Sequence, residues 1–484
     1  MNPQFRLGQA KVHFIGIGGI GMCGLAELLH NMGASVTGSD ANDNLQTQRL
    51  VSLGIPVYQG HHASNLNEAE VVVYSSAIRP DNVEFKEARK RQIPLIRRAE
   101  ALAEIMRLKR GIAVGGTHGK TTTTSLTASI FLAAQMDPTI VVGGRLDVIK
   151  ATAQLGQGDW LIAEADESDG SFLRLAPEVV IITNVDNDHL DHYGNFKNLQ
   201  EAFVNFAQQI PFYGAAIVCG DDVQTKALFK DFPKRIIFYG ENADNDVILK
   251  VDPSATDCYQ LWQVAGPNSD VAGAIGLRPG AVGPGADSGP GEFLCSFDLP
   301  LPGRHNALNA CAAILAAREA GVSMSVASAA VAQFKGVDRR FQHKATIRGI
   351  EFFDDYGHHP TEVAAVLSGF KEQFPEQRLL VIFQPHRYSR TQSCWEQFRA
   401  CFKLSDQLFL LDVYPAGEAP IENINSERLA KEVDHPNCQY ISRVKDPDLT
   451  AVSAVLQAGD VVVTLGAGDV VKVGERLMER LAKS

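Results

Sequence analysis

The chain has 484 residues, of which 45% are hydrophobic and 21% are charged, and its formal net charge is −11. A chain of this length exceeds what one hydrophobic core supports and predicts about three domains. The acidic balance argues against a broad nucleic-acid-binding or membrane-binding face, since such a face needs clustered Lys and Arg. Anionic substrates stay open, because they need only local positive charge.

Residues 1–9 contain no apolar segment of a signal peptide, and no apolar run reaches the roughly 18 residues of a membrane span. The eight cysteines are dispersed, with no C-x-x-C pair. Such spacing indicates neither a disulfide framework nor a zinc site. We expect a cytoplasmic protein without membrane insertion.

The first hundred residues alternate short apolar runs with helical patterns. Strands are predicted at 12–17, 35–39 and 71–75, and helices at 22–32 and 82–92. This alternation is typical of βαβ units around a parallel sheet.

A glycine-rich turn, Gly16–Gly21, joins the first predicted strand to the first predicted helix, and Asp40 ends the next strand. This pattern is the dinucleotide fingerprint, in which a diphosphate lies on a helix N-terminus and a carboxylate binds a ribose hydroxyl. The pattern predicts a diphosphate more surely than NAD, and a UDP-linked substrate would suit the same turn. A purely structural turn is the alternative.

Residues 111–124 predict a phosphate-binding loop between an apolar strand and a helix. Gly116 and Gly119 free the backbone N–H groups to face phosphate oxygens, Lys120 can reach the β/γ-phosphates, and the Thr121 hydroxyl is placed for Mg²⁺. Val114 stands where the strict P-loop pattern has its first glycine, so the loop is a shorter variant.

Two acidic segments follow the next predicted strands of this region. Glu164–Asp169 holds four carboxylates after the strand at 160–162, and Asn184–His192 follows the strand at 179–183. A solvated acidic face is the plain interpretation. The C-terminal end of a strand is, however, where open α/β sheets gather ligands, and Mg²⁺ beside ATP needs few protein oxygens.

The stretch at 265–292 is rich in Pro and Gly, and we expect a poorly ordered surface excursion there. Asn306 and Asn309 then share one face of a predicted helix, where a capping role is the alternative for Asn306. A third α/β alternation follows Gly336.

Strands of this third alternation are predicted at 379–383, 407–412 and 461–465. Two segments, 353–360 and 383–391, follow apolar strands and concentrate His, Arg and Tyr. In an acidic protein such a cluster predicts a clamp for a carboxylate or a phosphate.

Taken together, these motifs resemble the Mur ligase family along essentially the whole chain. The resemblance implies an α/β protein of three consecutive domains: a Rossmann-like UDP-sugar domain (1–107), a central P-loop ATPase domain with a parallel sheet (108–336), and a Rossmann-like amino-acid domain (337–484). The motifs that carry it are 16–22, 75–78, 116–123, 164–169, 184–189, 303–309, 339–341, 354–360, 384–391 and 414–418.

The resemblance also implies a reaction in peptidoglycan precursor synthesis. ATP would phosphorylate the D-lactoyl carboxylate of UDP-N-acetylmuramate, and the amine of L-alanine would attack the acyl phosphate, leaving ADP and phosphate. The implied metal is Mg²⁺, with Mn²⁺ as an alternative, and the implied assembly is a monomer or weak homodimer.

Site residues follow from the same resemblance. Those implied for catalysis are Lys120, Glu164, His189 and Arg340, and those for metal are Thr121, Glu164 and His189. The implied ATP site comprises Gly116, Thr117, His118, Gly119, Lys120, Thr121, Thr122, Asn306, Asn309, Arg340 and Asp355. The implied UDP-sugar site comprises Gly18, Gly19, Ile20, Gly21, Asp40, His61, Ser75, Ser76 and Ala77, and the amino-acid site comprises Tyr356, His358, His386, Arg387 and Arg390.

Two alternative functions stay open. A recycling ligase of the same family attaches a whole tripeptide to the same sugar nucleotide, but Tyr356-Gly357 and the 384–391 segment favour the single amino acid, since that relative resembles Phe-Ala at the first position. An NAD-dependent oxidoreductase would explain Gly16–Gly21 and Asp40, yet it leaves Lys120 and the Glu164 cluster without a role.

Overall fold

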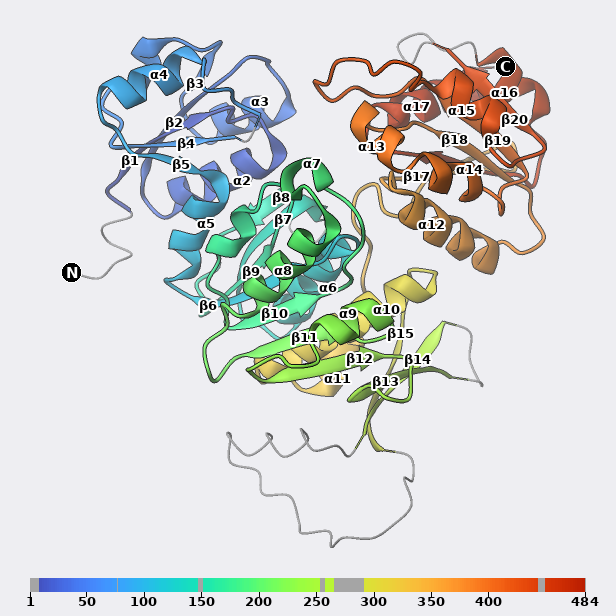
Figure 1. Ribbon diagram of the computed structural model, residues 1–484, viewed down its shortest axis with the longest axis horizontal. Helices are drawn as coiled ribbons and strands as arrows, with labels where there is room; N and C mark the ends of the chain where they lie inside the picture. The colour runs from blue at the N-terminus through green and yellow to red at the C-terminus, as the bar shows by residue number, and fades with distance from the viewer. Residues whose placement is uncertain are drawn as a thin grey trace, which may run out of the picture. The chain divides into compact units, whose positions relative to one another are not determined.

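The computed structural model describes residues 8–75, 77–146, 151–252, 257–264, 291–442 and 449–483. The chain divides into two compact units, Met1–Pro300 with Leu308–Lys335 and Leu301–Ala307 with Gly336–Ser484. Three β-sheets form, drawn in blue, in cyan to yellow, and in orange to red in Figure 1. The predicted excursion at 265–292 lies outside the described residues except for its last two positions.

The N-terminal sheet is fully parallel, with the strand order β3-β2-β1-β4-β5. Because β1 is central and its neighbours β2 and β4 extend the sheet in opposite directions, the turn after β1 lies at the topological switch point where such sheets bind ligands. The elements are β1 (Lys11–Ile15), α2 (Ile20–Asn31), β2 (Ser35–Asp40), α3 (Leu45–Ser52), β3 (Val57–Gln59), η1 (Ala63–Leu66), β4 (Val71–Tyr74), α4 (Val83–Lys90), β5 (Leu95–Arg97) and α5 (Arg98–Met106).

The central sheet has the order β15-β14-β13-β12-β11-β10-β6-β9-β7-β8 and is parallel from β13 to β7, with antiparallel strands at both edges. Its first elements are β6 (Arg110–Gly115), α6 (Lys120–Ala133), β7 (Thr139–Leu146), β8 (Ala151–Gln154), β9 (Trp160–Glu164), η2 (Ser171–Arg174), β10 (Val179–Ile182), α7 (Leu190–Tyr193), α8 (Phe196–Ala207) and β11 (Ala215–Cys219). The remaining ones are α9 (Val223–Leu228), β12 (Ile236–Gly240), β13 (Val247–Val251), β14 (Cys258–Gln263), β15 (Glu292–Asp298), α10 (Arg304–Glu319) and α11 (Met324–Ala332).

The C-terminal sheet has the order β16-β17-β21-β18-β19-β20 and is parallel except for β16. Its elements are β16 (Gln342–Ile347), β17 (Ile350–Asp355), α12 (Pro360–Gln373), β18 (Leu379–Phe383), α13 (Tyr388–Ser393), α14 (Trp395–Ala400), β19 (Gln407–Leu411), α15 (Ser426–Glu432), β20 (Cys438–Ile441), α16 (Thr450–Val455), β21 (Val461–Leu465) and α17 (Val470–Lys483).

Helices cover both faces of this C-terminal sheet. Alternate residues of β18, Leu379, Val381 and Phe383, pack in a core with α12, α14 and α15. The intervening Leu380 and Ile382 pack with α16 and α17. Such strands are apolar throughout because both faces are buried, which is why they stand out in the sequence.

The predicted α/β fold with three consecutive domains is confirmed by this architecture. The predicted strands and helices match observed elements to within a few residues. Among the described residues, no helix is long and apolar enough to cross a membrane.

Candidate active site

The topology of the central sheet brings three loops together. Strand β6 pairs with β9 on one side and with β10 on the other, all parallel. The loop after β6, residues 116–119, therefore lies between the acidic segment that follows β9 and the segment 183–189 that follows β10. Neighbouring parallel strands thus place the predicted phosphate loop beside both acidic segments at one edge of the sheet.

Glycine is required at two positions of this loop. Gly116 has φ +130° and Gly119 has φ +82°, a region that side chains other than glycine rarely adopt. A Cβ atom on Gly116 would lie 2.0 Å from Thr183 Oγ1, and one on Gly119 would lie 2.6 Å from Asn309 Oδ1. Asn309 therefore lies against the loop, next to the start of α6.

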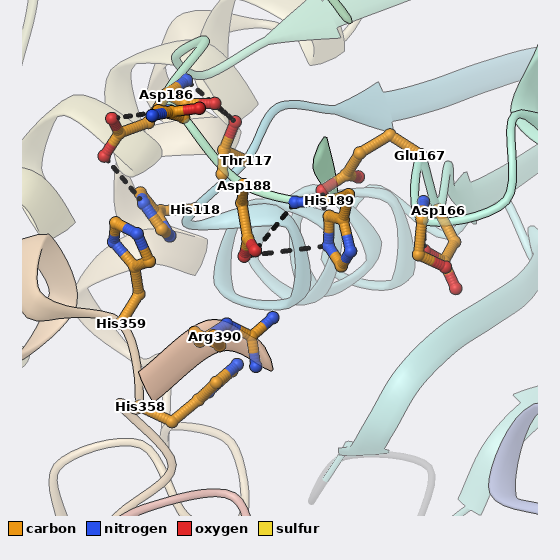
Figure 2. A network of polar contacts seen from close by, with 12 residues as sticks. Thr117, His118, Asp166, Glu167, Asp186, Asp188, His189, His358, His359 and Arg390 are labelled. Carbon is orange, nitrogen blue, oxygen red and sulfur yellow. Dashed lines mark hydrogen bonds and ion pairs between the residues drawn. The ribbon is translucent and has the colours of Figure 1, made fainter. Parts of the chain in front are cut away.

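The side chain of Asn184 fixes the backbone of the loop. His118 N donates to Asn184 Oδ1 at 2.9 Å, and Asn184 Nδ2 donates back to His118 O at 3.0 Å. Asp186 adds a second fastening, because its backbone N donates to Thr117 Oγ1 at 2.9 Å and its carboxylate lies 3.1 Å from His118 Nε2 (Figure 2). The segment that follows β10 thus holds the backbone of the loop in shape.

Lys120 is the buried cation of the site. Its Nζ donates to Gly116 O at 2.7 Å, to Thr117 O at 3.0 Å and to Glu167 Oε1 at 2.8 Å. Burial, the largest influence, lowers the pKa of Lys120, but the carboxylates of Glu167 and Glu164 together raise it above its ordinary value. The lysine is therefore a fixed positive charge, as phosphoryl transfer requires.

The residues around Lys120 suit a divalent cation. Thr121 Oγ1 donates to Glu164 Oε2 at 3.0 Å, and His189 Nε2 lies 3.7 Å from Glu167 Oε1. Glu167 Oε2 is buried without a hydrogen-bond partner, and burial raises the pKa of Glu167 to about 7 against the opposing charge of Lys120. Hydroxyl and carboxylate oxygens are the ligands that Mg²⁺ prefers, so this donor set fits the ion.

At the N-terminal sheet the glycine-rich turn and Asp40 are in direct contact. Gly18 N donates to Asp40 Oδ2 at 2.9 Å, and a Cβ on Gly18 would lie 2.9 Å or less from Asp40 Oδ2 and from Asn44 Nδ2. Ser75 follows β4 beside the same turn, since its Cβ lies 3.3 Å from where a Cβ on Gly16 would be. Ser76 and the side chain of Ile20 lie outside what the structure describes.

Two arginines join the N-terminal sheet to the acidic segment within the same unit. The guanidinium of Arg98 lies 3.1 Å from where a Cβ on Gly21 would be, and Arg98 Nη2 lies 3.5 Å from Asp166 Oδ2. Arg97 Nη1 lies 3.9 Å from Asp169 Oδ2. Arg98 thus places positive charge at the start of α2, and no motif predicted it.

In the C-terminal unit, Asp355 ends β17 and is buried. Its carboxylate accepts from Phe341 N at 2.8 Å and from Gly357 N at 2.7 Å. Burial raises the pKa of Asp355 to about 6, although the nearby Arg340 opposes the shift. The guanidinium of Arg340 also lies 5.3 Å from the centre of the Tyr356 ring, so Arg340, Asp355 and Tyr356 form one cluster.

The predicted amino-acid residues also lie together at this edge. The His358 and His386 rings are 5.6 Å apart, and Arg390 Nη1 lies 3.4 Å from His386 Nδ1. Burial lowers the pKa of His358 to about 3, so this ring is neutral near pH 7. Arg387 lies just before α13 and has φ +69°, a backbone conformation that is uncommon for residues other than glycine.

The predicted site residues thus form three groups: the N-terminal turn, the phosphate loop, and the C-terminal cluster. Asn306 lies in the first turn of α10, where its Nδ2 donates to Pro302 O at 2.7 Å. The sequence analysis did not single out Asn184 or Glu167, although both lie in the acidic segments that it named. It gave no signal for Arg98 or for the buried Glu84.

Comparison with known proteins shows the family to which the chain belongs. Family models match residues 11–110 (Mur ligase family, catalytic domain), 114–317 (Mur ligase middle domain) and 339–468 (Mur ligase, glutamate ligase domain). The chain belongs to the Mur ligase family, an enzyme family, which confirms the resemblance carried by its motifs.

Within the family, the chain is similar to enzymes named UDP-N-acetylmuramate–L-alanine ligase. It is 54% identical to the one from Bdellovibrio bacteriovorus, covering 98% of this chain and 100% of that protein, and 45% identical to the one from Geobacter sulfurreducens, covering 98% of each. The crystal structure of UDP-N-acetylmuramate-alanine ligase MurC from Thermotoga maritima superposes with a TM-score of 0.76 at 27% identity, covering 98% of this chain and 100% of that one.

The raised pKa of Asp355 predicts a pH-dependent contribution to stability. The carboxyl binds its proton more tightly in the folded chain, with a pKa of about 6, than at the ordinary value of 3.8. Its contribution therefore favours folding at acid pH and is lost as the pH rises from about 4 to 6. We expect this loss to be absent in Asp355→Asn, so the wild type should lose more thermal stability than the variant across this range.

The measurement is the unfolding midpoint of the C-terminal unit at a series of pH values in the absence of nucleotide. Asp338→Asn serves as the control, because it removes a carboxyl from the same unit whose side chain accepts from Gln342 Nε2 at 3.0 Å. Parallel pH curves for wild type and Asp355→Asn would contradict the assignment.

Proposed function

We propose that the protein is an ATP-dependent ligase that joins L-alanine to the D-lactoyl carboxylate of UDP-N-acetylmuramate, giving ADP and phosphate. The observation that carries the proposal is the 54% identity, over nearly the whole chain, to an enzyme named for this reaction. The same reaction places the protein in peptidoglycan precursor synthesis in the cytoplasm, where ATP is supplied.

The chemistry explains why Lys120 and its neighbours are needed. A carboxylate is a poor electrophile, so a phosphoryl group must first be installed on it as a leaving group. The carboxylate and ATP are both anions, and their approach requires fixed positive charge. Lys120 supplies that charge to the transferring phosphoryl group, at the N-terminal end of α6.

We assign the metal to Thr121, Glu164 and His189, with the free oxygen of Glu167 as a further ligand. When bound, Mg²⁺ would neutralise charge on the β- and γ-phosphates. Thr117, His118, Thr122 and Asn309 complete the loop side of the ATP site, and Asn306, Arg340 and Asp355 are assigned to its remainder.

Substrates are assigned to the other two clusters. The UDP-sugar is assigned to residues 1–107, with its diphosphate at Gly18–Gly21 and further contacts from Asp40, His61 and Ser75–Ala77. L-Alanine is assigned to residues 337–484, where Tyr356, His358, His386, Arg387 and Arg390 orient its carboxylate and amine. We assign the ATPase domain to residues 108–336.

A phosphate-release assay with UDP-N-acetylmuramate and a panel of amino acids and peptides tests the function. We expect release to require L-alanine, ATP and Mg²⁺, with far lower rates for the tripeptide L-alanyl-γ-D-glutamyl-diaminopimelate. A preference for the tripeptide would indicate the recycling reaction instead. Release with no dependence on the sugar nucleotide would overturn the proposal.

Replacing Lys120 with Ala should abolish ligation. The change removes the fixed charge beside the transferring phosphoryl group and leaves Glu167 buried without its partner, while the sugar nucleotide is held by a separate sheet. We expect kcat/KM to fall at least 1,000-fold, about 4 kcal/mol, with UDP-N-acetylmuramate binding by calorimetry unchanged. Retention of more than about a tenth of wild-type kcat/KM would refute the role.

The assignment of L-alanine predicts a selective effect of Arg387→Ala and Arg390→Ala. A guanidinium can bind the carboxylate of the amino acid through paired hydrogen bonds while the amine attacks. We expect each variant to raise the KM for L-alanine at least 10-fold, while acyl-phosphate formation, trapped by borohydride reduction, persists. Arg399→Ala is the control, because Arg399 ion-pairs with Glu396 on α14 of the same unit. An unchanged L-alanine KM in both variants would show that these arginines serve another group.

A further inference from the structure

A buried carboxylate organises one end of the N-terminal sheet. Glu84 is the second residue of α4, and its side chain is 0% exposed. Its Oε1 accepts from Asn65 Nδ2 at 2.6 Å and from His62 N at 3.2 Å, and its Oε2 accepts from Ser39 Oγ at 2.5 Å. These donors come from β2 and from the segment around η1, so one carboxylate joins three parts of the sheet edge.

Glu84 is an anion despite its burial. Burial by itself raises the pKa of the Glu84 carboxyl, but the ring of His13, 3.7 Å away, and the hydrogen bonds from Ser39 and Asn65 bring the pKa down to about 2. The first turn of α4 adds a favourable dipole at this position. A buried charge is stable only when several donors satisfy it, as they do here.

The anion also determines where the ring of His61 carries its hydrogen. His61 Nδ1 lies 2.9 Å from Ser39 Oγ and 3.2 Å from Glu84 Oε2. The Ser39 hydroxyl hydrogen is directed to Glu84, so Ser39 Oγ presents a lone pair to His61. Both neighbours of Nδ1 are thus acceptors, and Nδ1 must be the donor. A neutral ring then leaves Nε2 bare, as an acceptor.

This ring lies beside the turn assigned to the diphosphate. Gly16 N and Ile17 N donate to Ser39 O at 2.8 and 3.0 Å, so the residue that contacts His61 through its side chain holds the glycine-rich turn through its backbone. The His61 side chain is 20% exposed. Since Nδ1 is engaged on the protein side, Nε2 is the ring atom left for a ligand.

We propose that Glu84 is a positioning residue that acts through His61: it fixes the ring hydrogen on Nδ1 and so presents Nε2 as an acceptor to a hydroxyl or N–H donor of the UDP-sugar. The identity of the ligand rests on the proposed function. The competing explanation is that Glu84 only fastens α4 to the neighbouring loop.

The first test needs no substitution at Glu84. Long-range ¹H–¹⁵N spectra of the full chain labelled with ¹⁵N-histidine, recorded at alkaline pH, report which nitrogen carries the hydrogen. His61→Gln identifies the signal. We expect the His61 hydrogen on Nδ1, and a hydrogen on Nε2 would overturn the proposal whatever the enzyme's activity proves to be.

The second test replaces Glu84 with Gln. The amide can turn its NH₂ group toward His61 Nδ1, which would move the ring hydrogen to Nε2 and make it a donor. We expect the hydrogen to move in the spectra and the KM for UDP-N-acetylmuramate to rise at least 10-fold. The kcat and the KM values for ATP and L-alanine should change less than 2-fold. Glu87→Gln on the same helix, where Glu87 lies 3.8 Å from Lys90, is the matched control.

The double variant separates positioning from a merely structural role. If Glu84 acts through His61, Glu84→Gln should have no further effect on the sugar-nucleotide KM in a His61→Gln background. An equal rise in both backgrounds would show that Glu84 is only structural. Should Glu84→Gln fail to fold, a ring hydrogen on Nε2 in the wild-type spectrum would still overturn the proposal. If the wild type catalyses the ligation and Glu84→Gln leaves the KM for UDP-N-acetylmuramate unchanged, this inference alone is wrong. If the wild type is inactive toward UDP-N-acetylmuramate, the proposed function is wrong.

Discussion

The ion pair between Lys120 and Glu167 is the interaction on which the central site depends. The two side chains are 14% and 1% exposed, so bulk water solvates both charges poorly. A buried pair needs further hydrogen bonds, and Gly116 O and Thr117 O provide them to Lys120, whereas Glu167 Oε2 is left without one. Because Lys120 begins α6 and Glu167 follows β9, the pair also fixes the phosphate loop to the acidic segment.

The N-terminal sheet also contains a buried charge, of the opposite sign to that of Lys120. There the buried group is an anion, Glu84, which accepts hydrogen bonds from neutral donors and lies beside the rings of His13 and His61. In both places a buried charge at the carboxyl edge of a parallel sheet orders the loops around it. Function at these edges therefore depends on few groups, each with several hydrogen bonds.

The ligation chemistry accounts for the distribution of charge over the molecule. The chain is acidic overall, yet Arg98, Lys120, Arg340, Arg387 and Arg390 all lie at or beside the carboxyl edges of its sheets. Four anionic groups would take part in the proposed reaction: a diphosphate, a triphosphate and two carboxylates. Local cations at the strand ends can bind them without making the whole surface basic.

The sequence by itself determined the fold class, the strands and the loops that carry chemistry, because buried parallel strands are continuous apolar runs and phosphate loops need glycines at set spacings. Only the tertiary structure decided which strands are neighbours. Strand order brings Asn184 into hydrogen-bonding contact with His118, places Arg98 beside Gly21 and Asp166, and places Glu84 beside His61. These contacts join residues 20 or more positions apart. No local pattern encodes them, because they arise from the order of strands in the sheet and from which buried charges must be satisfied.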